Sequence, residues 1–275
     1  MRVNFLLCTL ASMKKFRRGF TLIEVLVVIG IIGLLMAILL PTLERVRHQS
    51  YIVKCAANLH ALGQGLHVYA NENHGAYPRT AYLAGAPYTK GTGSAGADPF
   101  TAGGPATNDL TAPLFLLLRT QKIPAVTMIC PYNDVNVFTA DTAQLDQHSN
   151  FTDYTKNLGY SYANPYPSAA AEKDYHLTDH LSADFAVMAD LNPGPKGYNG
   201  DFTSVTATSP WSKKKKLNSE NHEEGGQNVL YIDGHVDWKT TVFAGPNGDN
   251  IFTTADGQME ASPVNRNDCV LLPSQ

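Results

Sequence analysis

The chain opens its longest apolar run with Gly19-Phe20-Thr21-Leu22-Ile23-Glu24 and continues it to Leu40. A basic segment at Met13–Arg18 comes directly before the run. Because about 20 apolar residues suffice to cross a bilayer as a helix, the run predicts a membrane span. A carboxylate such as Glu24 costs on the order of 2.5–3.5 kcal/mol at mid-bilayer. The presence of Glu24 therefore indicates a function beyond simple anchoring.

This stretch resembles the processing signal of type IV prepilins and type II secretion pseudopilins. In that family prepilin peptidase cuts after the glycine, here Gly19, and methylates the new N-terminus, here Phe20. The glutamate is the fifth residue after the cut, as Glu24 is in this chain. The resemblance implies that Phe20 and Glu24 take part in assembly with other pilin-like subunits. A bare hydrophobic anchor is the plainer interpretation, and it leaves the register of these residues unexplained.

An ordinary secretory signal peptide is a competing interpretation of the same run. It would have an apolar core of about 7–15 residues followed by small residues at a cleavage site. This run is longer, and Leu39-Leu40-Pro41-Thr42 is a poor site of that kind. The lysines and arginines before the run should keep that side in the cytoplasm. We therefore expect a single-pass inner-membrane protein whose C-terminal domain lies in the periplasm or cell envelope, and a periplasmic or extracellular filament after assembly.

The 275 residues divide into three predicted parts. Residues 1–19 are the expected leader peptide, with translation starting at Met1 or Met13. Residues 20–41 are the expected transmembrane and assembly helix. Residues 42–275 are the expected periplasmic pilin-like domain, with the soluble half of the helix at 42–71. The net charge of −3 and the pI near 6.3 argue against a nucleic-acid partner.

Hydrophobic periodicity predicts one helix from about Thr21 to Ala70, loosened or kinked at Pro41, before a turn signal at Asn71–Gly75. Residues 77–111 predict a long loop, Leu110–Gln121 a short helix, and Val126–Cys130 a short strand. Further strands are expected at 160–162, 185–189 and 228–238. The predicted fold class is α+β, with the long N-terminal helix packed on an antiparallel sheet as in pilins.

A hairpin is the clearest local pattern in the second half of the chain. Asp233-Gly234 predicts a type I′ turn. Pairing around that turn would place Val229, Tyr231, Val236 and Trp238 on one face.

The hairpin carries a second resemblance. His222, with Asp233-Gly234 further on, is similar to the C-terminal signature of a large group of bacterial prepilin-like proteins, named for a histidine, nine residues and Asp-Gly. Ten residues separate His222 from Asp233 here, an extra residue that we assign to Glu223–Gly226. Cys55–Leu59 and Cys130-Pro131 also resemble that group. The resemblance implies a pilus-like fold and no settled activity.

Metal binding by His222, Asp233, His235 and Asp237 is conceivable. The favoured interpretation is that Asp233 makes the turn, that His235 and Asp237 lie on a solvated strand face, and that His222 belongs to the loop before it. The four lysines at Lys213–Lys216 predict a solvated loop, with binding to an acidic partner as the alternative.

Three cysteines follow the expected cut, namely Cys55, Cys130 and Cys269. Disulfides form in oxidising compartments outside the cytoplasm. Since Cys55 lies on a packing face of the predicted helix, we expect a disulfide between Cys55 and Cys130, with Cys269 as the alternative partner.

A glycine-punctuated stretch near the C-terminus is rich in side-chain oxygens, which Ca²⁺ prefers. The candidate ligands are Asn247, Asp249, Asn250 and Asp256. Major pseudopilins hold calcium in a C-terminal loop, so the resemblance raises the expectation of Ca²⁺ here. A plain turn-rich loop is the competing interpretation, because the spacing is not that of an EF-hand.

The sequence nominates no catalytic centre, because the patterns His-Glu-x-x-His, Cys-x-x-Cys and Gly-x-Ser-x-Gly are absent from it. We therefore expect a structural pseudopilin or pilin-like subunit, not an enzyme, in an envelope filament for secretion or adhesion. The alternative is a membrane-tethered extracytoplasmic binding module, for instance for a polysaccharide, that uses the same processing signal.

Overall fold

The structure is a computed structural model that describes residues 19–132, 145–197 and 204–274. Its chain divides into two compact units, one ending at Val46 and one beginning at Arg47. The helices of at least four residues are α1 (Leu22–Glu72), α2 (Ala112–Thr120), η1 (Ala125–Met128), α3 (Tyr154–Asn157), α4 (Gly194–Gly197) and α5 (Trp211–Lys214). Shorter 3-10 turns lie at η2 (Leu145–Gln147), η4 (Lys215–Leu217), η5 (Glu220–His222) and η6 (Pro246–Gly248).

The helix α1 begins and ends where local chemistry favours it. At its start, Glu24 Oε2 accepts hydrogen bonds from Thr21 N at 2.8 Å and from Thr21 Oγ1 at 2.7 Å. In return, Glu24 N donates to Thr21 Oγ1 at 3.3 Å. This reciprocal arrangement resembles a capping box, which satisfies N–H groups left over in the first turn. At its end, Gly75 adopts a φ of +83°, and its N–H bonds back to Ala70 O at 2.8 Å. Pro41 lies inside the helix without ending it.

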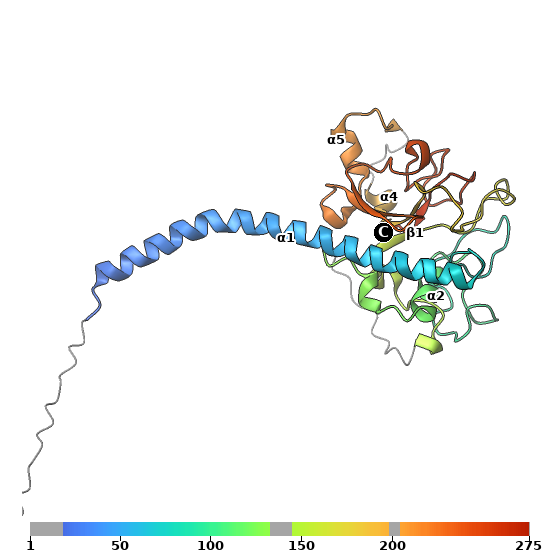
Figure 1. The fold of residues 1–275 in the computed structure, drawn as a ribbon, viewed down its shortest axis with the longest axis horizontal. Coiled ribbons are helices and arrows are strands. Elements are labelled where there is room, and N and C mark those ends of the chain that lie inside the picture. Colours follow the sequence, from blue (N-terminus) through green and yellow to red (C-terminus); the bar gives the residue numbers. More distant parts are fainter. Residues whose placement is uncertain (1–18, 133–144, 198–203, 275) are drawn as a thin grey trace, which may run out of the picture. The chain divides into compact units, whose positions relative to one another are not determined.

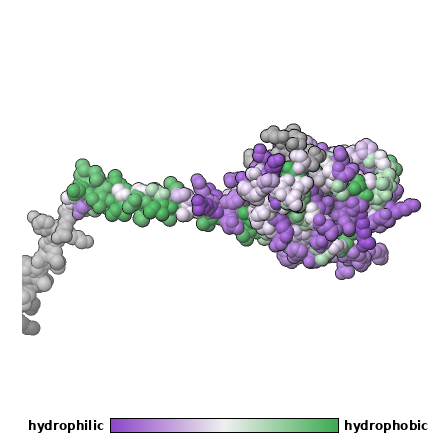
Figure 2. Space-filling model, turned by 90° about the horizontal axis from the view of Figure 1, so that it is seen from above, coloured by the Kyte–Doolittle hydropathy of each residue, from purple (hydrophilic) through white to green (hydrophobic). Residues whose placement is uncertain are grey.

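The first part of α1 exposes apolar side chains. Figure 2 shows this segment as a hydrophobic surface. An 18-residue window of α1 has a mean hydropathy of 3.0 and is 0% buried. Within the described residues, α1 is the one helix long and apolar enough to cross a membrane.

Five strands form one antiparallel sheet in the order β4-β3-β2-β1-β5. The strands are β1 (Tyr160–Ala163), β2 (Ala186–Asp190), β3 (Gln227–Tyr231), β4 (Val236–Lys239) and β5 (Leu271–Leu272). All residues of β1, β2, β3 and β5 are buried. The predicted α+β class, a long N-terminal helix on an antiparallel sheet, is confirmed.

The second half of α1 lies between α2 and the sheet (Figure 1). Its buried stripe consists of Ile52, Cys55, Leu59, Leu62, Gly63, Gly65, Leu66 and Ala70. A Cβ on Gly63 would come within 2.8 Å of Leu230 Cδ1 on β3, and one on Gly65 would come within 2.4 Å of Ile123 Cδ1, just after α2. The two glycines thus allow close packing on both sides of the helix.

The predicted hairpin is present, but the predicted turn type is wrong. Gly234 N bonds to Tyr231 O at 2.9 Å and Tyr231 N to His235 O at 3.0 Å, and Gly234 alone of the turn residues has a positive φ. These bonds define a three-residue loop with a left-handed glycine, the pattern of a type I turn followed by a bulge. The predicted faces are therefore displaced by one residue, because Leu230 pairs with Val236 and Asn228 with Trp238.

The predicted strand at Val126–Cys130 is also wrong, because residues 125–128 form the 3-10 turn η1. Pro124 O accepts the N–H of Thr127 at 2.9 Å, which closes the turn. The carbonyl of Ile129 then bonds to side chains, namely Asn58 Nδ2 at 3.0 Å and Tyr160 OH at 3.3 Å, instead of to a neighbouring strand.

Residues 77–111 contain no helix and no named strand, as the sequence predicts. The carboxylate of Asp109 holds this loop to the start of α2. Its Oδ2 accepts from Thr92 N at 2.8 Å, and its Oδ1 accepts from Thr111 N at 2.8 Å and Ala112 N at 3.0 Å.

The packing of α1 predicts a contrast between two substitutions. Leu62→Ala removes a fully buried side chain and should lower the free energy of unfolding by about 2–5 kcal/mol. Val53→Ala, on the same helix with Val53 61% exposed, should change it little. Chemical denaturation of the mature chain in a mild detergent measures both. Equal losses would contradict the observed packing.

Candidate functional site

The residues of the predicted processing signal lie at the start of α1. Gly19 and Phe20 precede the helix, and a Cβ on Gly19 would meet nothing within 4 Å. The Phe20 side chain is 74% exposed. Glu24 lies in the first turn, where Thr21 donates to its carboxylate. Among the described residues nothing covers Gly19 or Phe20, and the assigned roles of these residues stay predictions.

A second group of chemically active side chains lies deep in the domain. Cys55 comes from α1, Cys130 follows η1, Asp190 ends β2, and His222 ends η5. None of these four residues has any exposed surface. We call these four residues the buried cluster.

The four residues converge on one point. One ligand atom from each lies within 4.8 Å of the others. His222 Nε2 is 3.3 Å from Asp190 Oδ2 and 3.8 Å from Cys130 Sγ. The same ring nitrogen therefore faces both partners.

The neighbours of the buried cluster shift its protonation. A hydrogen bond from Cys55, aided by His222 and opposed by burial, lowers the pKa of Cys130 to about 6. Burial opposes the imidazolium of His222, but hydrogen bonds to Asp190 and Cys130 raise its pKa to about 9. The hydrogen bond to Cys130 and burial raise the pKa of Cys55. These directions favour a thiolate on Cys130 beside a protonated His222.

Aromatic rings fix the His222 imidazole in place. Its ring centroid is 5.5 Å from that of Trp238, 5.7 Å from Tyr132 and 6.0 Å from His48. His222 Nδ1 is buried and has no hydrogen-bond partner in the described part of the chain. Nε2 is thus the ring nitrogen that contacts other members of the buried cluster.

The arrangement differs from a nucleophilic cysteine triad. In such a triad one ring nitrogen faces the nucleophile and the other faces the orienting carboxylate. Here Nε2 faces both Cys130 and Asp190, and all three residues are buried. The chemistry that fits the four side chains is cation binding or thiol oxidation.

The predicted disulfide falls within this cluster. Cys55, Cys130 and Cys269 are free thiols in the structure, although the Sγ atoms of Cys55 and Cys130 lie within 4.8 Å of each other. The pairing of Cys55 with Cys130 stays a prediction. Cys269 lies outside the buried cluster.

Sequence reasoning placed His222 in an open loop and did not single out Asp190. The structure buries both, and Asp190 accepts from Asn228 N at 2.7 Å and Asn228 Nδ2 at 3.1 Å. The sequence signal for Asp190 was an acid directly after the predicted strand at 185–189. It gave no indication of its partners, because they come from distant parts of the chain.

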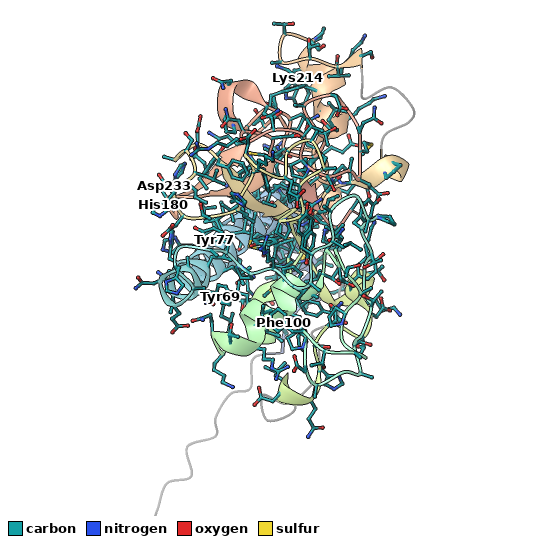
Figure 3. The ribbon with its side chains drawn as sticks, turned by 90° about the vertical axis from the view of Figure 1, so that its right-hand side faces the viewer. Tyr69, Tyr77, Phe100, His180, Lys214 and Asp233 are labelled. Atoms are coloured by element: carbon teal, nitrogen blue, oxygen red, sulfur yellow. The ribbon has the colours of Figure 1, made fainter. Side chains whose placement is uncertain are left out.

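Of the residues in the other two sequence hypotheses, His222 is buried, whereas Asp233, His235, Asp237 and the lysine run are at least partly exposed. Asp233 and His235 pair with each other, with side chains 45% and 49% exposed, and neither belongs to the buried cluster. The lysine run occupies α5 and η4, and Figure 3 shows Lys214 at the outer edge of the domain. Lys215 Nζ lies 5.7 Å from the ring centroid of Trp211.

The predicted calcium ligands are partly brought together. Asn247 and Asp249 line one surface hollow with Asn265, Asn267 and Asp268, whereas Asn250 lines a neighbouring one. Asp256 lines neither hollow, and its Oδ1 accepts from Thr254 Oγ1. Burial raises the pKa of Asp249 to about 7 and also raises that of Asp268. The hollow therefore adds Asp268, which the sequence analysis did not name.

Comparison with known proteins bears on the N-terminal signal. A family model described as the prokaryotic N-terminal methylation motif matches residues 14–40. No curated protein and no solved structure matches the chain significantly. The resemblance of the C-terminal half to the histidine and Asp-Gly group stays a prediction.

The match supports the prepilin-type signal and points to a type IV pilin-like protein that prepilin peptidase processes. Together with the apolar part of α1, it indicates a membrane-anchored single-pass protein. It also indicates a structural subunit.

The hollow beside Asp249 predicts weak calcium binding. Millimolar calcium should raise the melting temperature of the mature chain above its value in chelator, because Ca²⁺ would bind the folded state. Asp249→Asn should abolish the difference, whereas Asp237→Asn, on the exposed strand β4, should retain it. Identical melting curves of the parent chain in calcium and in chelator would show that the hollow does not bind calcium.

Proposed function

We propose that this protein is a pilin-like structural subunit that waits in the inner membrane and assembles through α1 into an envelope filament for secretion or adhesion. The observation that carries the proposal is the methylation motif at residues 14–40, with Glu24 in the first turn of an exposed apolar helix. The C-terminal domain lies on the periplasmic side, because the basic residues precede the span.

The exposed apolar part of α1 supports assembly. Between Phe20 and Leu43 its large side chains are 43–81% exposed, an extent that a protein in water does not leave uncovered. Lipid covers such a surface before assembly, and neighbouring helices cover it in a filament. The same apolar surface thus contacts lipid before assembly and neighbouring helices in the filament.

Glu24 supplies the polar contact between subunits in this proposal. Within the described residues of a single chain, the donors to its carboxylate are Thr21 N and Thr21 Oγ1. Cleavage after Gly19 creates a free ammonium at Phe20, and an unpaired charge in an apolar layer is costly. A neighbouring Phe20 ammonium that meets this Glu24 relieves both charges and fixes the axial stagger between helices.

Processing gives the first test of this function. Phe20 should be the mature N-terminus and should carry a methyl group, as N-terminal sequencing and intact-mass measurement of the protein from its native membrane would show. Gly19→Ala should be cut nearly as well as the parent, whereas Gly19→Val should block cutting because the peptidase must fit a small residue. An unprocessed chain, a cut near Thr42 or equal processing of both variants would contradict the mechanism.

Assembly gives the second test. Glu24→Val should be made, cleaved and inserted like the parent, yet fail to enter filaments, because the neighbouring ammonium loses its partner. Glu24→Asp should retain part of the activity, since it keeps the charge with a shorter reach. Shearing and immunoblotting of filaments measure the outcome, with Glu44→Val as a control for loss of an acid in the same helix outside the apolar run.

The rival function is a membrane-tethered binding module. Such a module needs neither a free Phe20 amine nor Glu24. A Glu24→Val variant that keeps the full function of the parent without assembling would therefore favour it. A domain that binds a ligand such as a polysaccharide while no filament forms would replace the proposed function.

A further inference from the structure

We propose that the buried cluster binds one zinc ion, which fastens α1 to the sheet. The cluster draws its residues from α1, the segment after η1, the end of β2 and η5. The proposal concerns the fold of the domain and is independent of filament assembly.

The convergence of electron-rich atoms is the first argument. Two sulfur atoms, a carboxylate oxygen and an imidazole nitrogen lie within 4.8 Å of one another, with no exposed surface. Such atoms repel each other unless protons or a cation lie among them. A single proton on His222 Nε2 cannot form good hydrogen bonds both to Asp190 at 3.3 Å and to Cys130 at 3.8 Å. A cation at the centre of the buried cluster would bind all four ligand atoms.

The distances fit a tetrahedral site. Zinc bonds of about 2.3 Å to sulfur and about 2.0–2.2 Å to nitrogen and oxygen imply ligand-to-ligand separations of about 3.3–3.8 Å. The Nε2–Oδ2 separation is 3.3 Å and the Nε2–Sγ separation to Cys130 is 3.8 Å. The remaining separations are at most 4.8 Å, so roughly one ångström of movement closes the site.

The ligand types select the metal. Thiolates disfavour hard cations such as Ca²⁺ and Mg²⁺, and two thiolates with an imidazole are a common set for zinc. Asp190 would fill the fourth position, so no position is left open for a substrate. A closed site of this kind stabilises structure and does not catalyse a reaction.

The surroundings hold the ligands in place before any metal arrives. Asp190 accepts two hydrogen bonds from Asn228, the kind of outer support that orients ligating carboxylates. A Cβ on Gly159 would lie 2.3 Å from Cys130 N, so only glycine admits the Cys130 backbone this closely. Gly159 O in turn accepts from Asn221 Nδ2 at 2.8 Å, which ties the segment before His222 to the same place.

Zinc binding and a disulfide between Cys55 and Cys130 exclude each other. In binding, both sulfurs act as thiolates and Nε2 of His222 is deprotonated, so whatever protons these three atoms carry beforehand leave to solvent. In disulfide formation the two sulfurs bond to each other and cannot act as thiolates. The state of the two sulfurs therefore decides between the proposal and its rival.

The decisive measurement uses the full mature chain, purified from the envelope in mild detergent without chelator. Elemental analysis and native mass spectrometry should find one zinc ion per chain and no disulfide. If the chain arrives free of metal with free thiols, titration with zinc should load one ion per chain. Cobalt in place of zinc should give the thiolate-to-cobalt charge-transfer absorption of a tetrahedral site. Removal of the metal with a strong chelator should lower the melting temperature.

Variants locate the metal. Cys55→Ser and His222→Gln should reduce the zinc content from one per chain towards none, whereas Cys269→Ala, a buried cysteine outside the cluster, should keep it. The measurements on the parent chain stand even where a variant fails to fold. A Cys55–Cys130 disulfide in the protein as isolated, free thiols that take up neither zinc nor cobalt, or zinc retained in both cluster variants would overturn the proposal.

Discussion

The burial of one face of α1 between Arg47 and Glu72 is the constraint on which the second unit depends. The stripe from Ile52 to Ala70 is covered by α2 on one side and by β3 on the other, and Gly63 and Gly65 permit that closeness. Polar contacts then fix the register of the helix. Asn228 Nδ2 of β3 donates to Ile52 O at 3.2 Å, and Asn58 Nδ2 donates to Ile129 O at 3.0 Å. The first bond joins α1 to the strand β3, and the second joins α1 to the segment after η1. A shift of α1 along its axis would therefore break both bonds as well as the packing.

The same helix meets two different environments along its length. Residues up to Leu43 expose apolar side chains, whereas beyond Arg47 one face is buried and the other carries polar residues. Hydrophobic burial within the chain can therefore stabilise only the second part. The first part needs lipid or other helices around it. Glu24 is the exception in that part, and its carboxylate accepts hydrogen bonds from Thr21 within the same chain.

Local patterns predicted the elements of the fold well and their connections less well. The sequence placed α1 within two residues of its observed bounds, because a long apolar run followed directly by a periodic apolar stripe leaves little choice. The hairpin register was displaced because Asp-Gly suits both two-residue and three-residue loops. The deciding contact is remote in sequence: Ile232 N bonds to Phe185 O at 3.0 Å, which draws Ile232 towards β2 and lengthens the loop. The buried cluster was hidden for the same reason, since Asp190 and His222 meet only after β2 and β3 have paired.

His222 and the Asp233-Gly234 turn are positioned by different contacts in the structure. Asp233-Gly234 fixes the pairing of β3 with β4, whereas His222 is held by Asp190, on β2, and by the rings around it. Between them, Glu223 and Glu224 adopt left-handed φ values of 56° and 58°, which turn the chain back towards the sheet. At Gly226 the chain again lies close against β4, since a Cβ there would lie 2.5 Å from Lys239 O. The histidine and the turn are thus held by separate contacts with the sheet, so the number of residues between them matters less than the pairing of β2 with β3 that both require.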